Sequence, residues 1–558
     1  MLTSMTAVSS SMETVDTKTA IYAVGAFIVL TAWLILRKRT SNLPNGPRGL
    51  PLFGNMFSMK DGTLLHLKLT EWAHKYGDFY SFMMGRSPVI VLNSPQAIND
   101  LFVKRGSKYS SRPKASNQAS IITQNARIVA IPYGEQWRKH RKVYHELLNM
   151  QNAKIFLPYQ EYESRRTLKN LLDEPAGFWR EVTRYSASVT FSLLLGCRFD
   201  SADTAIPQEI NKRMLMMFKG IRPGAWLVDW VPFLDYLPDA LAPWRASAVD
   251  LRNQIMPFFL IFYNAMKERI RRNTAPDCFL ARLLKQEGSV FDESEPPHII
   301  ATTMAAGTDT TATTLQWFFK AAILFPDAVR KAQEEIYRVV GPDRLPNWED
   351  RPNLPYLAAL LDETHRWATA TPLAFIHATS EADVYRGKDI PRGAIVYSNV
   401  YAVHNDPHIF ARPEEWIPER FLPKSDKRAA PEANHAGTHY AFGAGRRECP
   451  GRHVADASLY IVISRILWAY DIVGNPKKPP PRGYCKPHDC HPAQDHELNS
   501  SLAGAFPVFG PARFEATLKP RSETAIRLIR EEAEINRPAE MEDSTVYDKL
   551  VAQLLSDP

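Results

Sequence analysis

The sequence predicts a mainly α-helical protein with small β-sheets, in which a single large domain follows an N-terminal transmembrane helix. The chain has 558 residues, 45% of them hydrophobic, which is enough for one substantial core. Long stretches carry the apolar period of helices, and only short runs such as 79–83, 89–92 and 394–397 have the character of strands. Polar insertions at 423–439 and 475–499 predict surface loops.

Charge and cysteine content argue against two classes of protein. The 68 basic and 60 acidic residues give a net charge of +8, and the basic residues are scattered along the chain. A nucleic-acid-binding protein would gather them in a stripe, so no nucleic-acid partner is expected. The five cysteines follow no repeating spacing, so a disulfide-stapled secreted protein is not expected either.

Residues 19–36 predict a membrane anchor. They form an 18-residue run without a charge, followed directly by a basic triplet at 37–39. At ~1.5 Å per residue such a helix spans ~27 Å, about the hydrocarbon thickness of an endoplasmic reticulum bilayer. A cleaved signal peptide is the alternative, but its basic residues would precede the run. The positive-inside rule then predicts a single-pass protein of the endoplasmic reticulum membrane, with residues 1–18 in the lumen and the large domain in the cytosol.

The remaining boundaries follow from composition. Residues 37–55 form a basic linker rich in proline and glycine, which cannot be a helix. Residues 56–522 form the predicted catalytic domain. Residues 523–558 form a charged C-terminal extension in which we recognise no chemistry.

Residues 442–451, FGAGRRECPG, place Cys449 in a turn punctuated by glycines. Small residues there let backbone N–H groups approach a thiolate sulfur and let a flat ligand lie close. Such a turn could hold a reactive cysteine, an incidental cysteine, or an axial ligand to haem iron.

The loop resembles the haem-binding loop of the cytochrome P-450 family. The pattern F-x-x-G-x-R-x-C-x-G is matched at every fixed position: Phe442, Gly445, Arg447, Cys449 and Gly451. Four further sequence motifs of the family occur in the same order as in the family. They are W-x-x-x-R, A-G-x-D-T-T, E-x-x-R and P-E-R-F. The resemblance spans nearly the whole chain after the linker. It implies the cytochrome P-450 fold, with the Cys449 thiolate as axial ligand to the iron of heme b.

Residues 297–325 predict one long helix bounded by prolines, with A-G-T-D-T-T at 306–311 in its middle. Glycine and β-branched threonines lower helix propensity there by roughly 0.5–1 kcal/mol per residue. A close helix crossing, with threonines bonding to the preceding turn, would explain this structurally. The resemblance implies instead a distorted turn in which Asp309 and the Thr310 hydroxyl relay protons to oxygen.

Glu363 and Arg366 lie three residues apart and can pair on one helical face. Alone, such a pair would be an ordinary surface ion pair. The resemblance implies a buried triad with Arg420 that supports the haem-binding core and takes no part in catalysis.

Haem carries two propionates, which need cations when they are buried. By resemblance, the residues that bind them are Trp137, Arg141, His377 and Arg447. Other basic residues on the Trp137 helix form either a solvated face or a docking surface for an acidic electron donor. They are Arg138, Lys139 and Lys142.

The resemblance also implies which segments form the pocket wall opposite Cys449. They contribute apolar residues: Ile121, Ile122, Ile128, Val129, Met304, Ala305, Leu373, Ala374, Phe375, Ala505 and Phe506. Each could equally be ordinary core. Together they predict a bulky apolar substrate that is held by shape rather than by ion pairing.

The implied activity is that of a haem-thiolate monooxygenase resembling fungal secondary-metabolism members. It would take NADPH-derived electrons from NADPH-cytochrome P-450 reductase, with cytochrome b5 as a second donor, and use O2 as co-substrate. Hydroxylation, epoxidation or multistep oxidation of a terpenoid or polyketide intermediate is expected. Two alternatives remain. One is a haem-thiolate isomerase, dehydratase or peroxide-driven enzyme without a reductase, and the other is a non-catalytic haem-binding protein.

Overall fold

The computed structural model describes most of the chain. The described residues are 22, 25–27, 42–50, 53–58, 64–85, 87–113, 117–201, 204–221, 226, 228, 232–285, 291–422, 439–482, 490–492, 508–539 and 541–556. The predicted anchor at 19–36 falls outside them except at four positions, as do Ala505 and Phe506. Among the described helices, none has both the length and the apolar character that crossing a bilayer requires.

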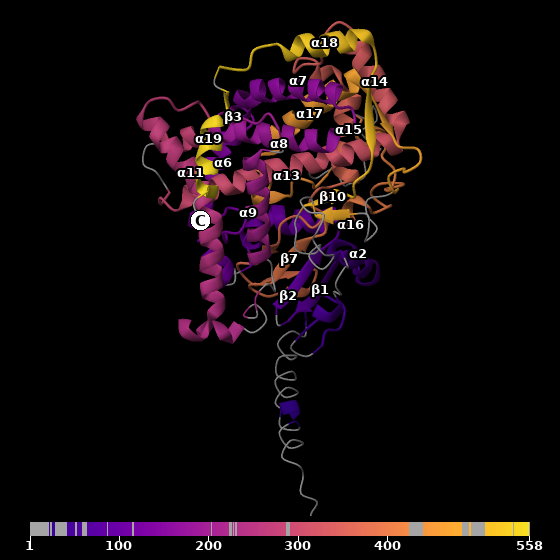
Figure 1. Ribbon diagram of the computed structural model, residues 1–558. Helices are drawn as coiled ribbons and strands as arrows, with labels where there is room; N and C mark the ends of the chain where they lie inside the picture. Colours follow the sequence, from indigo (N-terminus) through magenta and orange to yellow (C-terminus); the bar gives the residue numbers. More distant parts are fainter. Residues whose placement is uncertain are drawn as a thin grey trace, which may run out of the picture.

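Helices make up most of the described structure and the sheets are small, as the sequence predicted (Figure 1). The α-helices are α2 (Leu65–Tyr76), α3 (Pro95–Ile98), α4 (Gly106–Tyr109), α5 (Asn117–Thr123), α6 (Glu135–Leu148), α7 (Leu157–Asp173), α8 (Phe178–Leu195), α9 (Ala205–Ile221), α11 (Pro243–Arg271), α12 (Phe279–Lys285), α13 (Glu295–Leu324), α14 (Pro326–Val340), α15 (Pro355–Trp367), α16 (Val400–His404), α17 (Arg452–Ala469), α18 (Glu523–Ala533) and α19 (Thr545–Ser556). The strands are β1 (Phe79–Met84), β2 (Ser87–Leu92), β3 (Cys197–Arg198), β4 (His377–Ala378), β5 (Asp383–Tyr385), β6 (Lys388–Ile390), β7 (Ile395–Ser398), β8 (Tyr470–Gly474), β9 (Cys490–Pro492), β10 (Phe509–Pro511), β11 (Ala516–Pro520) and β12 (Glu542–Asp543).

The largest sheet has four strands in the order β1-β2-β7-β4. β1 and β2 form an antiparallel hairpin with Phe79 opposite Leu92, and Gly85 supplies the positive φ of 57° that its turn needs. β7 joins β2 in parallel, and β4 pairs antiparallel with β7. The three strands predicted from the sequence are therefore confirmed. Because β4 begins at His377, this sheet also fixes one of the predicted haem-binding residues.

Helices α8, α13 and α17 are buried on nearly all sides and form the centre of the molecule. A helix that is apolar around its circumference must be covered by other elements. Residues between 315 and 322 of α13 pack in a cluster with α7, α8, α15 and α17, whereas residues between 299 and 304 pack with α6, α9 and α11. Figure 1 shows α7, α8 and α13 stacked above the β1-β2-β7 sheet. α13 thus joins the two large apolar clusters.

The predicted long helix is confirmed as α13, but its prolines act differently from the prediction. α13 begins at Glu295, so Pro296 and Pro297 lie inside its first turn. The N–H groups of a first turn have no partner within the helix, so prolines cost little there. Pro326, expected only to stop the helix, also opens α14.

The C-terminal segment is packed into the body of the protein. α18 buries one face, which includes Leu528 and Ile529, in the cluster that surrounds α17. β12 then pairs in parallel with β3, and α19 buries Tyr547 and Val551 in the cluster that contains α11. The C-terminal extension, in which the sequence revealed no chemistry, therefore contributes to packing of the core through α18 and α19.

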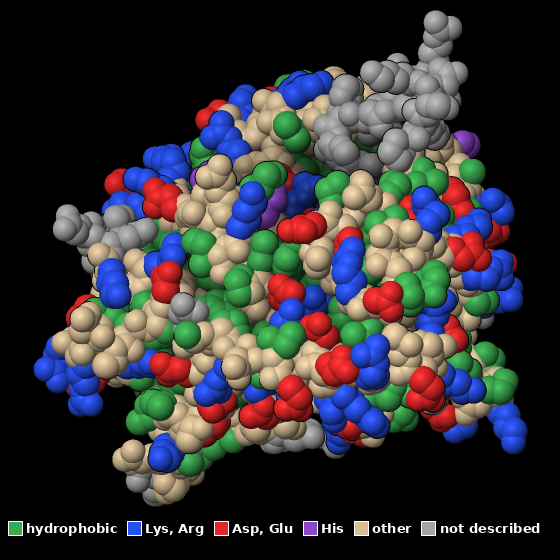
Figure 2. All heavy atoms as spheres, turned by 90° about the horizontal axis from the view of Figure 1, so that it is seen from above, with side chains coloured by type: hydrophobic (Ala, Val, Ile, Leu, Met, Phe, Trp, Pro, Cys, Tyr) green, Lys and Arg blue, Asp and Glu red, His purple; other side chains and the backbone are tan. Residues whose placement is uncertain are grey.

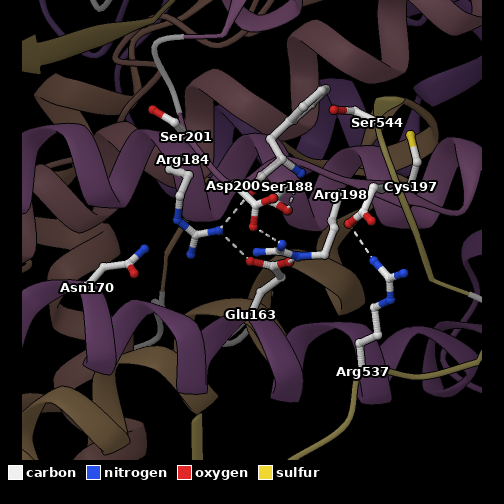
Figure 3. Close-up of polar contacts among 12 residues, drawn as sticks. Glu163, Asn170, Arg184, Ser188, Cys197, Arg198, Asp200, Ser201, Arg537 and Ser544 are labelled. Carbon is white, nitrogen blue, oxygen red and sulfur yellow. Dashed lines mark hydrogen bonds and ion pairs between the residues drawn. The ribbon is translucent and has the colours of Figure 1, made fainter. Parts of the chain in front are cut away.

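A buried ion-pair network lies at β3, beside the C-terminal segment (Figure 3). The Glu163 carboxylate is fully buried and accepts from Arg184 at 2.5 Å and from Arg198 at 2.7 Å. Arg184 also forms an ion pair with Glu181, in which Nη2 lies 2.7 Å from Oε1. Because every buried charge here has a partner, the network is a structural one.

Charges of both signs cover the face seen in Figure 2, which views the molecule from above relative to Figure 1. On α14, for example, Arg330 lies 3.1 Å from Asp327 and 3.8 Å from Glu334. Basic and acidic side chains of the described residues are interspersed on this face.

Candidate active site

The predicted haem-binding loop closes into a tight turn ahead of α17. The Cys449 amide donates to the Phe442 carbonyl at 2.9 Å, which draws the ends of the loop together. Gly443 and Gly445 have positive φ angles of 78° and 67°. A Cβ at Gly445 would lie 2.1 Å from the carbonyl oxygen of Phe102, so only glycine fits there. Backbone geometry thus explains the spacing of the glycines.

The Cys449 thiol is surrounded by a hydrogen-bond donor and a cation. Burial raises its pKa, whereas a hydrogen bond from the Gly451 amide and the charge of Arg141 lower it. Arg141 is held next to the loop because it donates to the Glu448 carbonyl at 2.6 Å. Burial alone would disfavour a thiolate at this position, but the amide and the cation stabilise the negative sulfur. A sulfur in these surroundings is therefore suited to bind a metal ion.

Arg447 ties the cysteine loop to the segment before α6. Its guanidinium donates to the carbonyl oxygens of Ser110, Ile128 and Ile131 at 2.8, 3.0 and 2.7 Å. Its central carbon lies 4.5 Å from the centre of the Trp137 ring, a cation–π distance. Trp137 and Arg447, which are distant in sequence, therefore form one unit.

His377 is accompanied by an arginine that the sequence analysis did not identify. His377 Nδ1 lies 2.7 Å from the Tyr109 carbonyl oxygen. Arg112 is 9% exposed and donates to the carbonyl oxygens of Val129 and Ile376, both at 2.7 Å. Arg112 stands in a loop without periodicity, so no sequence signal could have singled it out.

The guanidinium groups of Arg112, Arg141 and Arg447 form a cluster of positive charge in which Arg112 is buried and the other two are half-buried. Burial, together with the charges of Arg112 and Arg141, lowers the pKa of Arg447 to about 8. Burial also lowers the pKa of His377 well below its usual value, with added effects from Arg112 and Arg447. Within the described residues, no carboxylate lies within 4.0 Å of the three guanidinium groups. Buried charges need partners, so the cluster fits an anionic group such as the two propionates of haem b.

The A-G-x-D-T-T segment stays α-helical within α13. Ser186 of α8 donates to the Gly307 carbonyl at 3.0 Å, and a Cβ at Gly307 would lie 2.5 Å from Thr190 Oγ1. Thr310 Oγ1 donates to the Ala306 carbonyl at 2.7 Å. The close helix crossing and the back-bonded threonine are both present, and the structure does not show the distorted turn that the resemblance implied.

Asp309 and Thr310 lie on a partly accessible stretch of α13. Both keep part of their surface exposed, and Ala306 is exposed, whereas residues 311–322 of the same helix are buried. A central helix with an accessible stretch is placed to line a cavity. The proton-relay role of the pair stays a prediction.

The chain matches a known family over most of its length. The family model described as Cytochrome P450 covers residues 44–494. The chain belongs to the cytochrome P450 family. Relatives include the cytochrome P450 monooxygenase polD of Polytolypa hystricis (strain UAMH7299), 37% identical over 523 residues, which are 92% of this chain and 96% of that protein. Another is the cytochrome P450 monooxygenase virE of Hypocrea virens (strain Gv29-8 / FGSC 10586), 35% identical over 521 residues, 91% of each chain.

A third relative is the cytochrome P450 monooxygenase fogE of Aspergillus ruber (strain CBS 135680), 34% identical over 532 residues, which are 93% of this chain and 94% of that protein. The chain is therefore a cytochrome P450 monooxygenase, an oxidoreductase of a haem-thiolate family that uses a redox partner and a small-molecule substrate. The alternative of a non-catalytic haem-binding protein is set aside.

The structure brings the three residues of the predicted triad together. Glu363 and Arg366 of this cytochrome P450 are fully buried, and two hydrogen bonds of 2.7 and 2.8 Å join them. Arg420 Nε lies 3.3 Å from the same carboxylate, which also accepts from the Ile417 amide at 2.8 Å. The pair is therefore not the exposed ion pair that its spacing alone would suggest.

The predicted pocket residues of this cytochrome P450 divide between clusters. Those from α5, from the loop between α5 and α6, and from α13 share one apolar cluster, either in its core or packed against it: Ile121, Ile122, Ile128, Val129, Met304 and Ala305. Leu373 packs with the β1-β2 sheet, Ala374 packs with a neighbouring cluster, and Phe375 is 40% exposed. Arg112 links the two groups, because it bonds to the carbonyls of both Val129 and Ile376. Whether these residues contact substrate stays a prediction.

The basic cluster lies on an accessible face of α6. Lys139 and Lys142 are 46% and 76% exposed and lie 3.8 Å from Glu135 and Glu146, respectively. Such exposed pairs contribute little to stability. The structure is therefore compatible with both interpretations of the basic cluster, a solvated face and a docking surface for an electron donor.

Proposed function

We propose that this cytochrome P450 oxidises a bulky lipophilic molecule, a terpenoid or polyketide intermediate of secondary metabolism. The reaction is hydroxylation, epoxidation or a series of oxidations. The observation that carries the proposal is the cluster of unpaired cations beside Cys449, which fits a haem. The apolar cluster formed by the loop before α6 and by α13 supports a lipophilic substrate.

In this proposal Cys449 holds the haem iron through its thiolate, with the Gly451 amide and Arg141 stabilising the negative sulfur. Arg112, Arg447 and His377 hold the propionates. When bound, the haem supplies the chemistry of reductive O2 activation, which the thiolate promotes.

Asp309 and Thr310 hold and pass the protons that the reaction consumes. NADPH-cytochrome P-450 reductase supplies the electrons, and the basic face of α6 is its docking surface, with Lys139 and Lys142 at its exposed centre. Membranes that contain the enzyme should form product only when both NADPH and the reductase are present. Product formation without them would favour an isomerase or a peroxide-driven enzyme.

Thr310→Ala should lower the product formed per NADPH consumed at least severalfold, because a positioned proton donor contributes ~10²–10⁴-fold to a proton-transfer step. Haem content and substrate affinity should not change. The measurement compares NADPH oxidation, product and hydrogen peroxide in reductase-containing membranes.

Thr314→Ala is a matched control, since Thr314 also back-bonds within α13, to the Thr310 carbonyl at 2.9 Å. It should couple NADPH to product as the wild type does. Unchanged coupling in both Thr310→Ala and Asp309→Asn would remove this pair from the mechanism.

We infer that the protein is anchored in the endoplasmic reticulum membrane by residues 19–36, with its catalytic domain in the cytosol. Deleting residues 1–39 should move most of the protein to the soluble fraction and leave its haem content unchanged, because we expect the anchor to contribute nothing to the fold. Fractionation with a haem assay measures both. A truncated protein that cannot bind haem would contradict a dispensable anchor.

A further inference from the structure

Arg127 is a buried cation without an anionic partner. Arg127 is only 3% exposed. Its guanidinium contacts the sulfur of Met214, with Nη2 at 4.0 Å from Sδ. Its Nε has no hydrogen-bond partner, and no carboxylate among the described residues lies within 4.0 Å. A buried charge in this condition is costly, so its retention calls for a ligand.

A structural role does not account for these contacts. Arg112 and Arg447, the buried arginines nearby in the fold, each bind backbone carbonyl oxygens and so join chain segments. Arg127 makes no such bond. Among the described residues, its Nε has no acceptor and its Nη2 contacts a weak one, Met214 Sδ. Guanidinium donors are arranged in a fork that matches a carboxylate.

Two neutral polar side chains lie close enough to Arg127 to feel its charge, Tyr144 of α6 and His298 of α13. The Tyr144 hydroxyl lies 3.1 Å from Thr303 Oγ1, and His298 Nε2 lies 3.0 Å from Gln124 Oε1. His298 Nδ1 has no hydrogen-bond partner. Burial, together with the charge of Arg127, lowers the pKa of His298 to about 3, so this imidazole is neutral and does not compete for an anion.

The position of Arg127 links this group to the haem side of the protein. The next two carbonyl groups along the chain, of Ile128 and Val129, accept from Arg447 and Arg112 at 3.0 and 2.7 Å. The Arg127 side chain reaches α9 instead, at Met214. Ile122 and Ile128 belong to the same apolar cluster as Met214.

Helix geometry gives the distance from this group to the predicted oxidation site. At about 1.5 Å per residue, Thr303 and His298 lie roughly 10 and 18 Å from Thr310 along α13. A ligand that reached from Arg127 to the oxidation site would therefore need a polycyclic or long-chain body to span this distance.

We propose that Arg127 binds the carboxylate of a lipophilic acid and so fixes which carbon is oxidised. This deepens the function proposed above and rests on it. It adds one ionic contact to a pocket for which the sequence predicted recognition by shape alone. The buried guanidinium gains the partner it lacks, and charge-assisted, bidentate bonds orient the acid.

The test uses three acids of different shape, each paired with its methyl ester: dodecanoic, dehydroabietic and ursolic acid. Binding to the full-length holoenzyme is measured by titration calorimetry and by the change in the haem spectrum. At least one acid should bind the wild type tenfold or more tightly than its ester. This preference should vanish in Arg127→Met, through weaker binding of the acid, and persist in part in Arg127→Lys. Arg271→Met, which removes an exposed charge on α11, should keep it.

Two outcomes would overturn the proposal. One is a wild type that prefers none of the acids, and the other is an acid preference that survives in Arg127→Met. Ligand-free Arg127→Met should keep its haem and unfold at the same or a higher temperature, because it loses an unpaired charge; a structural arginine would show a lower unfolding temperature. Absence of haem-thiolate absorption in the wild type would refute the proposed function instead, and calorimetry would still show whether Arg127 binds acids.

Discussion

Replacing Cys449 with alanine is expected to abolish the absorption band that marks thiolate ligation in the reduced, carbon-monoxide-treated protein, together with all product formation. The loop offers no second sulfur, and the Gly451 amide and Arg141 favour negative charge only at the position of Sγ. The arginine cluster would still attract the propionates, so some haem can remain bound without the thiolate. Difference spectroscopy of membranes measures the band, and a pyridine haemochromogen assay measures total haem.

Cys278→Ala is the matched control, because Cys278 is fully buried and burial raises its pKa to about 12, which keeps it a thiol. Its variant should retain the band, as should Cys485→Ala and Cys490→Ala. A Cys449→Ala protein that kept the thiolate band would contradict the assignment of the whole site.

The parts of the fold that depend on local pattern were predictable. The hairpin at 79–92 consists of two short runs rich in aromatic and β-branched residues, and the long helix that became α13 is bounded by prolines. The exact start of that helix could not be predicted, because proline occurs both just before a helix and in its first turn. The packing of 523–556 was also missed, since a short amphipathic helix has no visible partner until the rest of the chain is folded.

The candidate site shows the same division. Cys449, its glycines and Trp137 stand at fixed spacings that a sequence reveals. Arg112 and Arg127 do not, because each is a single arginine in an irregular loop. What distinguishes them is that no carboxylate among the described residues lies within 4.0 Å, a property of tertiary structure that no spacing in the sequence records.

Glu363→Gln is expected to destabilise the protein by about 3–5 kcal/mol, because it leaves two buried guanidinium groups without their carboxylate. Arg366 is fully buried, and the Arg420 side chain is 12% exposed. Glutamine keeps the volume and one acceptor, so the loss measures charge rather than a cavity. Thermal unfolding followed by circular dichroism reports the change. Glu334→Gln, which removes one partner of an exposed pair on α14, should cost less than about 1 kcal/mol.

The same substitution is expected to weaken haem binding, although Glu363 is not among the residues placed around the haem. Arg366 donates to the carbonyl oxygens of His404 and Glu415 at 2.8 and 3.0 Å, so the triad holds the segment that follows α16. Burial and nearby cations lower the pKa of His404 well below its usual value, and the neutral imidazole accepts from the Tyr440 amide at 2.9 Å. Tyr440 lies two residues before Phe442, the first residue of the cysteine loop. A freed Arg366 should therefore loosen that loop, and haem retained per folded protein should fall in Glu363→Gln but not in Glu334→Gln. Equal haem retention in the two variants would limit the triad to global stability.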